Sequence, residues 1–452
     1  MVDHTDHQVL ARLGLHTFAA KIAMYAMGLV ASILVARALG PEGRGEYFLP
    51  VTAVAIAIGL AHLGAPQAQI RLWSRGAGTP TEFVTANVLM TVGQTMLSVG
   101  GLGVLYWLTN DGIFRSVRAI DLAIAAIAIP FSLHNVRTGA LLGINGRGKA
   151  ANAALVIGTV IQTIGLVALY LLQSLSVRSV LILFVVSVEV PSLIRARELR
   201  KVAGVERPLP WSLIAQHLRL TPYFAPLWIL QHLNLRIDVF FLAQMRGTAA
   251  VGIYSIAVTF AELVWLATDA LTFASLEKQA DRSDAQAIDV TFRVIRMNFL
   301  LAGGLATSIA IVAPWILTGF YGSEFSRALP ALWILLPAAV AMSVWRAASQ
   351  GLVRFEKPWA LPAMTGSALL LNIVGNLLLI PRFGVAGAGI SSLVSYLASA
   401  VLAVAALCRR HRRTLDQVLP GRDEIRRLIQ LLAGLRPRRV DPRDNDLGIR
   451  PQ

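Results

Sequence analysis

The chain is poor in charged residues and almost free of cysteine. Asp, Glu, Lys and Arg make up 15% of its 452 residues, whereas an ordinary soluble domain contains about 25% of them. So few charges cannot cover the surface of a soluble protein of this size. Hydrophobic residues make up 56% and the mean hydropathy is +0.63, which indicates a chain surrounded by lipid.

The missing cysteines and missing motifs exclude several kinds of chemistry. Cys408 is the single cysteine, so neither an intrachain disulfide nor a cysteine-based metal site can form. The chain contains no HExxH or GxSxG motif. Gly143 to Lys149 matches the phosphate-loop pattern GxxxxGK, but Ala150 stands where a serine or threonine would bind magnesium. We therefore assign no catalytic residue, no metal and no cofactor, and we expect no ATP hydrolysis.

Twelve segments are long and apolar enough to cross a bilayer. A spanning helix needs about 20 mostly apolar residues, because about 30 Å of hydrocarbon is crossed at 1.5 Å per residue. The sequence therefore predicts an all-α integral membrane protein with about 12 transmembrane helices. The segments are residues 13–36, 48–70, 84–108, 119–142, 150–172, 177–193, 223–243, 251–271, 299–318, 329–351, 359–380 and 385–407.

Basic residues are distributed unevenly between the two sets of loops. If the amino terminus is cytoplasmic, the inner loops hold 18 Lys and Arg residues up to residue 408, the outer loops hold 8, and the tail from Arg409 adds 12 inside. By the positive-inside rule, we expect a multi-pass protein of the inner (cell) membrane with both termini in the cytoplasm. The bias also explains the net charge of +16 through orientation and contact with anionic lipids. Nucleic acid is therefore not an expected partner.

Polar interruptions divide the chain into two halves of six segments. The longest, from Arg195 to about Thr221, lies between the sixth and seventh segments on the cytoplasmic side. A second inner connection, residues 277–296, separates the eighth and ninth. We predict four parts, which are an N-terminal six-helix lobe at 1–200, a cytoplasmic linker at 201–216, a C-terminal six-helix lobe at 217–408 and a basic cytoplasmic tail at 409–452.

The two halves share a motif at an offset of 207 residues. Because each half has an even number of crossings, both halves have the same topology, and the axis that relates them lies along the membrane normal. Pairs of this kind commonly enclose a central substrate cavity and expose it alternately to the two sides. The matching residues are Gly40, Gly45 and Tyr47 in the first half and Gly247, Gly252 and Tyr254 in the second.

The basic tail has two interpretations. Ile425, Leu428, Ile429, Leu432 and Leu435 recur at helical spacing, with arginines nearby. This spacing fits an amphipathic helix on the inner membrane face. A disordered basic tail is the alternative, and the residues beyond Pro437 are expected to be disordered.

Six charged residues inside the predicted membrane helices are candidate site residues. A charge at the bilayer centre costs at least about 2.5 kcal/mol on insertion scales, so each needs a partner or a wet cavity. The basic side chains could bind an anionic headgroup, for which the planar fork of arginine suits phosphate. The acidic ones could hold those cations in place, or bind a coupling proton or sodium ion; alternatively, all six form ion pairs within the bundle or lie at helix ends. They are Lys21, Arg236 and Arg346 as candidate substrate-binding cations, and Asp238, Glu262 and Asp269 as candidate coupling or charge-pair residues.

The region around the first and seventh segments resembles a known family. Leu34 to Tyr47, with its Leu-Gly-x-x-x-x-Gly-x-Tyr core, is similar to the end of the first helix in polysaccharide-biosynthesis flippases. Asn234 to Leu242, leading into Gly252-Ile-Tyr254, is similar to that family's seventh helix and the turn after it. These flippases belong to the multidrug/oligosaccharidyl-lipid/polysaccharide exporter superfamily. The tail beyond Arg409 has no counterpart there.

The resemblance implies a function in transport. It suggests a flippase that moves undecaprenyl-pyrophosphate-linked oligosaccharide across the cytoplasmic membrane for cell-surface polysaccharide, with membrane lipids and a polysaccharide polymerase as further partners. It carries over no fixed substrate-binding positions. One alternative is a multidrug or cation antiporter of the same superfamily. The other is a membrane glycosyltransferase, polymerase or ligase, against which the short outer loops argue, because such enzymes generally carry a large outer loop.

Overall fold

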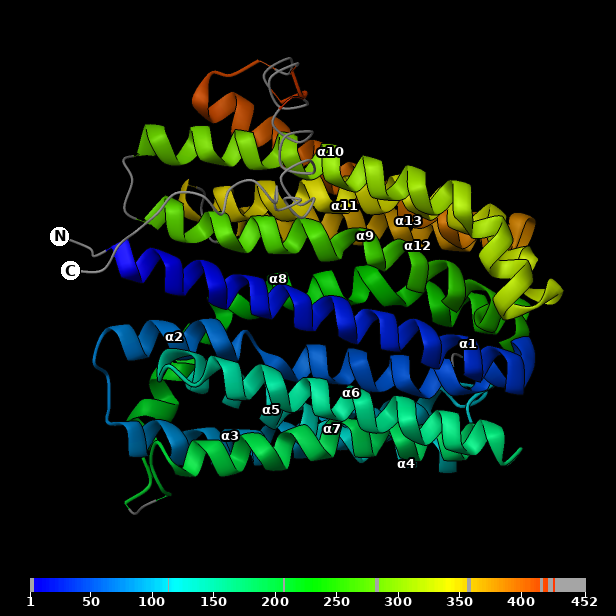
Figure 1. Ribbon diagram of the computed structural model, residues 1–452, viewed down its shortest axis with the longest axis horizontal. Coiled ribbons are helices and arrows are strands. Elements are labelled where there is room, and N and C mark those ends of the chain that lie inside the picture. The colour runs from blue at the N-terminus through cyan, green and yellow to red at the C-terminus, as the bar shows by residue number, and fades with distance from the viewer. Residues whose placement is uncertain are drawn as a thin grey trace, which may run out of the picture.

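The computed structural model of the protein is a bundle of long α-helices (Figure 1). It describes residues 4–112, 114–205, 208–280, 284–355, 359–414, 418–421 and 426. The side chains of residues 4–22, 266–267, 270, 273–280, 284–285 and 354–355 lie outside this description. No strand occurs among the described residues.

Thirteen α-helices and two short turns of other helix types follow one another within the described ranges. They are α1 (His4–His62), α2 (Ala65–Ser74), α3 (Pro80–Thr109), α4 (Ala119–Ala126), α5 (Ala128–Ile144), α6 (Gly148–Leu171), α7 (Val177–Arg200), α8 (Trp211–Arg246), α9 (Thr248–Ala280), α10 (Asp284–Ile316), η1 (Leu317–Tyr321), η2 (Ser323–Ala328), α11 (Leu329–Phe355), α12 (Ala360–Phe383) and α13 (Val385–His411).

The helices account for the twelve predicted crossings. Ten stretches among the described residues are long and apolar enough to span a membrane. The first, from Ala23 to Ser74, holds two crossings, because Gly40 adopts a φ of 64° and breaks α1 into two arms. Helix α8 is 36 residues long but more polar than these stretches, and it supplies the remaining crossing. The predicted all-α membrane fold is therefore confirmed.

Local sequence explains where several helices begin and bend. The Thr79 side chain accepts from the Glu82 amide, and Glu82 bonds back to the Thr79 amide, which is a capping box at the start of α3. A second break follows α1 at Leu63 and Gly64, both with positive φ. Non-helical backbone at membrane depth is tolerated only where protein or a wet cavity surrounds it. This break packs against Phe224 of α8.

Two predicted connections are shorter than the sequence indicated. Residues 277–296 were expected to be a loop, but α9 continues to Ala280 and α10 begins at Asp284. Similarly, α8 begins at Trp211, inside the predicted 201–216 linker. The physical reason is that a helix satisfies its own backbone hydrogen bonds in water as well as in lipid, so hydropathy marks the membrane boundary and not the helix end. Except for Arg426, the predicted amphipathic helix of the tail lies outside the described residues.

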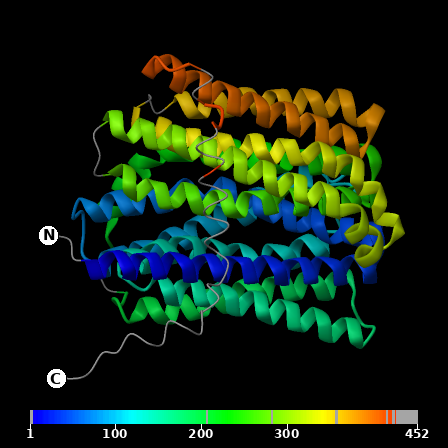
Figure 2. The same cartoon turned by 45° about the horizontal axis from the view of Figure 1, so that its top comes forward.

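The helices lie side by side in two groups (Figures 1 and 2). We call α1–α7 the first half and α8–α13 the second half. In Figure 1 the first half is below, the second half is above, and α1 runs between them against α9. Helix α8 contacts both halves. Its first turns, with Leu213 and Ile214, join the apolar cluster of α2 and α3, whereas its later residues pack against α12.

The repeated motifs of the two halves meet at one end of the bundle. A Cβ atom on Gly45 would lie 1.9 Å from the Thr248 carbonyl oxygen, and one on Gly252 would lie 1.9 Å from the Pro41 carbonyl oxygen. Residues that are equivalent in the repeat therefore touch each other, which places the contact at the axis between the halves. We call this end, opposite the start of α1, the closed end.

A buried arginine reinforces the closed end. Arg44 is 5% exposed, and its guanidinium donates to the Ser255 hydroxyl of α9 at 2.7 Å and to the Ser32 carbonyl of α1 at 2.8 Å. The Tyr321 hydroxyl also donates to the Ser32 hydroxyl, at 3.0 Å. Arg44 thus links the first half to the second beside the glycine contact. The sequence alone places Arg44 among the eight basic residues of the outer loops.

Candidate functional site

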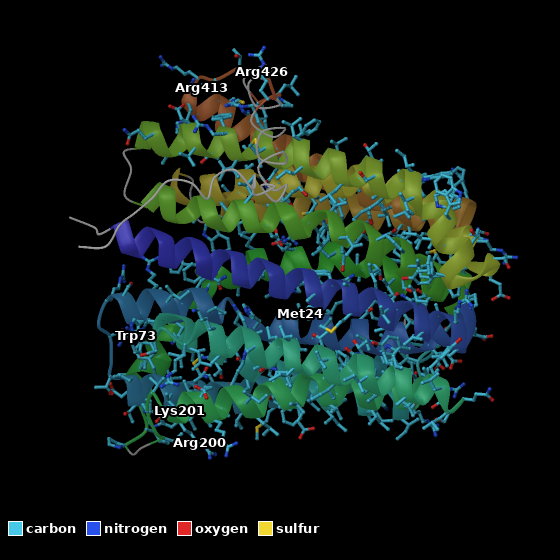
Figure 3. The ribbon with its side chains drawn as sticks, in the orientation of Figure 1. Met24, Trp73, Arg200, Lys201, Arg413 and Arg426 are labelled. Atoms are coloured by element: carbon cyan, nitrogen blue, oxygen red, sulfur yellow. The ribbon has the colours of Figure 1, made fainter. Side chains whose placement is uncertain are left out.

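A cavity of about 390 Å³ lies between the two halves. Residues 24–29 of α1 and 152–159 of α6 line it from the first half, and residues 259–263 of α9 line it from the second. At 1.5 Å per residue, the lining part of α1 lies roughly 17–24 Å from Gly40, near mid-membrane depth. Figure 3 shows Met24 in the space between α1 and α6. We call this the central cavity.

The central cavity carries polar groups from three helices. Asn152 and Thr159 come from α6, Thr259 and Glu262 from α9, and Tyr25 from α1. Hydroxyl and amide groups can both donate and accept hydrogen bonds, which suits sugar or phosphate oxygens as well as water. These groups line the cavity on the same helices as apolar residues such as Leu29, Leu155 and Leu263.

Glu262 pairs with the first of the predicted cations. The Arg236 Nη2 atom of α8 lies 2.8 Å from the Glu262 Oε1 atom, and the side chains are 25% and 27% exposed. Because both stay partly exposed, the pair is not sealed in the core. The structure thus brings Arg236 to the edge of the central cavity as a guanidinium that is neutralised by an acid.

The second predicted pair lies further along α9. The Arg346 Nη1 atom of α11 lies 2.8 and 2.7 Å from the two carboxylate oxygens of Asp269. The Arg346 guanidinium carbon is also 4.6 Å from the ring centre of Trp265, which is a cation–π distance. Two acids seven residues apart on one helix face thus hold two different arginines. Arg346 does not line the central cavity.

Asp238 lies in a separate, fully buried cluster. Its side chain is 2% exposed and accepts hydrogen bonds from the Tyr254 hydroxyl and, at 3.1 Å, from the Ser392 hydroxyl of α13. One turn away, the Ser395 hydroxyl donates to Asn234 at 2.7 Å. Arg236 and Asp238, two residues apart, therefore face different surroundings. The cluster offers several oxygen atoms around one carboxylate.

Lys21 is placed only through its backbone. It precedes Tyr25 by four residues and Gly28 by seven on α1, so its Cα lies on the helix face that lines the central cavity. Its side chain lies outside the described residues.

Comparisons with known proteins agree with this arrangement. No protein-family model matches the chain. A probable flippase, AglR of Haloferax volcanii, is 25% identical over 178 residues, which is 38% of this chain and 37% of the relative. The chain therefore matches well under half of that relative's length.

Solved structures match over almost the whole chain. The lipid II flippase MurJ in an inward closed conformation aligns with a TM-score of 0.74 and 14% identity, covering 93% of this chain and 92% of MurJ. An inward-facing multidrug-resistance MATE transporter of the MOP superfamily aligns with a TM-score of 0.63 and 18% identity, covering 86% and 94%. A MOP superfamily transporter from Pyrococcus furiosus gives a TM-score of 0.63 and 16% identity, covering 88% and 94%.

The chain has the MOP exporter fold. At these identities the structural matches establish the architecture and leave the substrate open. In this chain, the fold encloses the central cavity between its two halves, and the glycine contact closes one end.

Two buried arginines of the first half were missed as site candidates. Arg137 is 2% exposed and donates to the side-chain oxygens of Asn87 and Gln94 at 2.9 and 3.2 Å. Arg195 is 6% exposed and donates to the Ala151 carbonyl at 3.0 and 2.8 Å. Among the described residues, neither guanidinium contacts a carboxylate. The sequence alone places both among the 18 basic residues of the inner loops, because Arg137 lies near the inner end of segment 119–142 and Arg195 just after segment 177–193.

Proposed function

We propose that the protein is a flippase for lipid-linked oligosaccharide, with a polyprenyl-pyrophosphate carrier such as undecaprenyl pyrophosphate. The observation that carries the proposal is a partly exposed arginine, Arg236, at the edge of a cavity that carries polar groups from three helices, between the halves of a MOP exporter fold. Pyrophosphate is an anion that an arginine can bind in two-point fashion. AglR, a probable flippase, supports this reading.

The proposed transport cycle uses the two ends of the bundle in turn. The headgroup enters the central cavity while the polyprenyl tail stays in lipid. The halves then rock about the axis so that the closed end opens and the other end shuts. The bias of basic residues toward one set of loops favours cytoplasmic termini, which puts the closed end outside. The proposed orientation is therefore inward-facing in this structure, in the inner membrane.

Arg236 must exchange partners for this cycle to work. In the present geometry Glu262 neutralises it at 2.8 Å. An arriving pyrophosphate carries more negative charge than one carboxylate, so it competes for the guanidinium. Lys21, on the same cavity face, adds a second cation to the proposed site. We propose that Arg346 and Asp269 fix α11 to α9 and leave substrate binding to these two.

Asp238 is the residue we propose for coupling to an ion gradient. The cluster around it consists of carboxylate, hydroxyl and amide groups, which suit either a proton or a hard cation such as sodium. Binding there would change the charge at the junction of α8, α9 and α13. A change of charge in a dry core shifts the packing of the helices that meet there.

The coupling proposal predicts the behaviour of Asp238→Asn. We expect flipping by the wild type in proteoliposomes to speed up when a proton or sodium gradient is applied. In Asp238→Asn the rate with and without the gradient is expected to be the same, because the amide binds neither ion as a charge. A variant that keeps its full response to the gradient contradicts the coupling role.

A multidrug or cation antiporter is the second candidate. Glu262 itself lines the central cavity and would attract a cationic drug if Arg236 released it. The likeness to MATE transporters fits this function as well. A glycosyltransferase, polymerase or ligase is disfavoured, because the connections at the closed end are short. A polymerase remains a proposed partner that uses the flipped product.

Reconstitution separates these functions. In proteoliposomes that contain a fluorescent polyprenyl-pyrophosphate oligosaccharide, we expect the protein to expose the label to a quencher added outside. Lys21→Ala is expected to lower this rate by roughly tenfold, because the loss of one hydrogen bond to a charged group costs about 1.5 kcal/mol. Uptake of a cationic dye without flipping would support the antiporter, and new glycosidic bonds in the lipid fraction would support an enzyme. In cells, deletion should trap lipid-linked repeat units inside while their synthesis continues.

A further inference from the structure

An apolar groove lies on the outer face of the second half, away from the central cavity. It measures about 850 Å³, lies between α10, α11 and α13, and shares no lining residue with the central cavity. Small side chains hollow it out, among them Gly303, Ala306, Ala341 and Ala400. A Cβ atom on Gly303 would meet nothing within 4 Å. We call it the outer groove.

The outer groove is long enough for a lipid chain. Its lining residues on α10 run from Ile295 to Ala310, which is roughly 22 Å at 1.5 Å per residue. One leaflet of hydrocarbon is about 15 Å deep, half of the 30 Å core. The groove runs along the helices and therefore roughly along the membrane normal. A whole fatty-acyl chain fits along it.

Arginines gather where the groove ends near the carboxyl terminus of α13. The Arg409 Nε atom donates to the carbonyl of Ala405, a lining residue, at 3.4 Å. The chain then reverses at Arg412, whose φ is 50°, and Arg413 pairs with Asp289 of α10 at 2.6 Å. Val418 also lines the groove.

A further arginine comes from the other wall. Arg296 precedes Phe299 by three residues and Gly303 by seven, so it is on the face of α10 that lines the groove. Arg296, Arg409 and Arg413 therefore gather at this end, where Arg413 pairs with Asp289. Figure 3 shows Arg413 at this end of the second half, and Arg200 and Lys201 at the corresponding end of the first half.

We propose that the outer groove and its arginines bind one anionic phospholipid of the surrounding membrane. One acyl chain would lie in the groove, and the phosphate would contact Arg409 and Arg413. The apolar acyl chain of such a lipid matches the apolar groove. Its anionic phosphate matches the arginines at the end of the groove. A second copy of the chain would bring the same arginines against these, and like charges oppose that contact.

The proposed lipid has a structural consequence. The outer groove joins α10, α11 and α13, and a lipid that fills it would tie these three helices together. Binding to the folded state stabilises it by mass action. We therefore expect the protein to have a higher melting temperature with an anionic phospholipid than with a zwitterionic phospholipid.

Lipid titration of the purified full-length protein tests the proposal. Native mass spectrometry with phosphatidylglycerol or phosphatidylcholine reports the affinity of each, and a melting curve in detergent reports stabilisation. We expect phosphatidylglycerol to bind at least tenfold more tightly. The variant Arg409→Gln/Arg413→Gln should remove this preference, and Gly303→Leu should weaken both lipids by filling the groove.

Matched variants on the first half serve as controls. Arg197→Gln/Arg200→Gln removes two exposed arginines from the same end of the bundle, and Gly93→Leu adds a side chain at another open helix glycine. Both should leave the preference intact. Equal binding of the two phospholipids, or equal effects of test and control variants, would overturn the proposal. Binding of the lipid-linked oligosaccharide alone in the groove would also overturn the proposal. A dimer that dissociates in Gly303→Leu would do the same. Flipping activity is not needed for these measurements, so the result is independent of the proposed function.

Discussion

Neutralising the Arg236–Glu262 pair is expected to abolish most transport while leaving the protein folded. In Arg236→Gln/Glu262→Gln, two amides replace the ion pair and can still hydrogen-bond to each other, so α8 and α9 stay joined. The pyrophosphate, however, loses its guanidinium. A hydrogen bond to a charged group contributes about 1.5–3 kcal/mol, which corresponds to a flipping rate roughly 10- to 150-fold lower at limiting substrate.

The single variants show which residue serves the substrate. Arg236→Gln should lower the rate at least as much as the double variant does, because the unpaired Glu262 carboxylate repels the pyrophosphate. Glu262→Gln should instead strengthen substrate binding, because the competing carboxylate is gone, and slow the release step. The rate and the substrate concentration at half-maximal rate, both from proteoliposome flipping, distinguish these outcomes.

The control for this pair is an ion pair away from the cavity. Arg118 and Glu46 lie 3.2 Å apart, with side chains 63% and 24% exposed. Neutralising them is expected to change the rate by less than about twofold, since exposed pairs contribute about 1 kcal/mol or less. Equal rates for the wild type and the Arg236→Gln/Glu262→Gln variant would show that the pair is only structural.

The number of crossings could be predicted from sequence because the hydropathy of a segment indicates whether lipid or water surrounds it. Hydropathy could not predict that α9 and α10 extend beyond the predicted segments, since a helix continues for as long as its backbone hydrogen bonds are satisfied. Likewise, α8 was found as a crossing despite its polar residues, although its hydropathy falls below that of the ten apolar stretches.

The acids and cations of the second half could be found from sequence, but their partners could not. Counting charges inside apolar segments identifies Arg236 and Glu262, and helical spacing gives the face that Glu262 shares with Asp269. Which arginine each acid contacts depends on how α8, α9 and α11 pack. Ser392 lies 154 residues from Asp238, so no local spacing could connect them.

The buried arginines of the first half show a different limit of charge counting. Arg137 and Arg195 lie near helix ends, where the positive-inside rule expects basic residues. Both are nevertheless enclosed and bound by neutral oxygen acceptors of neighbouring helices. A rule based on position along the chain cannot distinguish a charge that faces water from one that is folded inward.

Adding one methyl group at the closed end is expected to have the second large effect on transport. In Gly252→Ala the new Cβ would lie 1.9 Å from the Pro41 carbonyl oxygen, and in Gly45→Ala it would lie 1.9 Å from the Thr248 carbonyl oxygen. Backbone atoms cannot yield as a flexible side chain can, so the halves must separate there. The apolar cluster of buried residues 288–408 lies within the second half and does not include this contact, so we expect a folded protein that cannot close outside.

We expect flipping to fall about 100-fold or more. Moving the equilibrium between the closed and open arrangements of this end from 99:1 to 1:99 needs about 5.5 kcal/mol, and a clash of this size supplies a large part of it.

The opening can be seen directly with a thiol reagent. Val251 is 0% exposed beside the contact, so Val251→Cys in a Cys408→Ser background should react slowly. Adding Gly252→Ala should speed the reaction, whereas Gly93→Ala, at a glycine with open space around it, should change neither labelling nor flipping. Slow labelling and full flipping in Gly252→Ala would contradict a gate at this glycine pair, and fast labelling with full flipping would show that closure there is not part of the cycle.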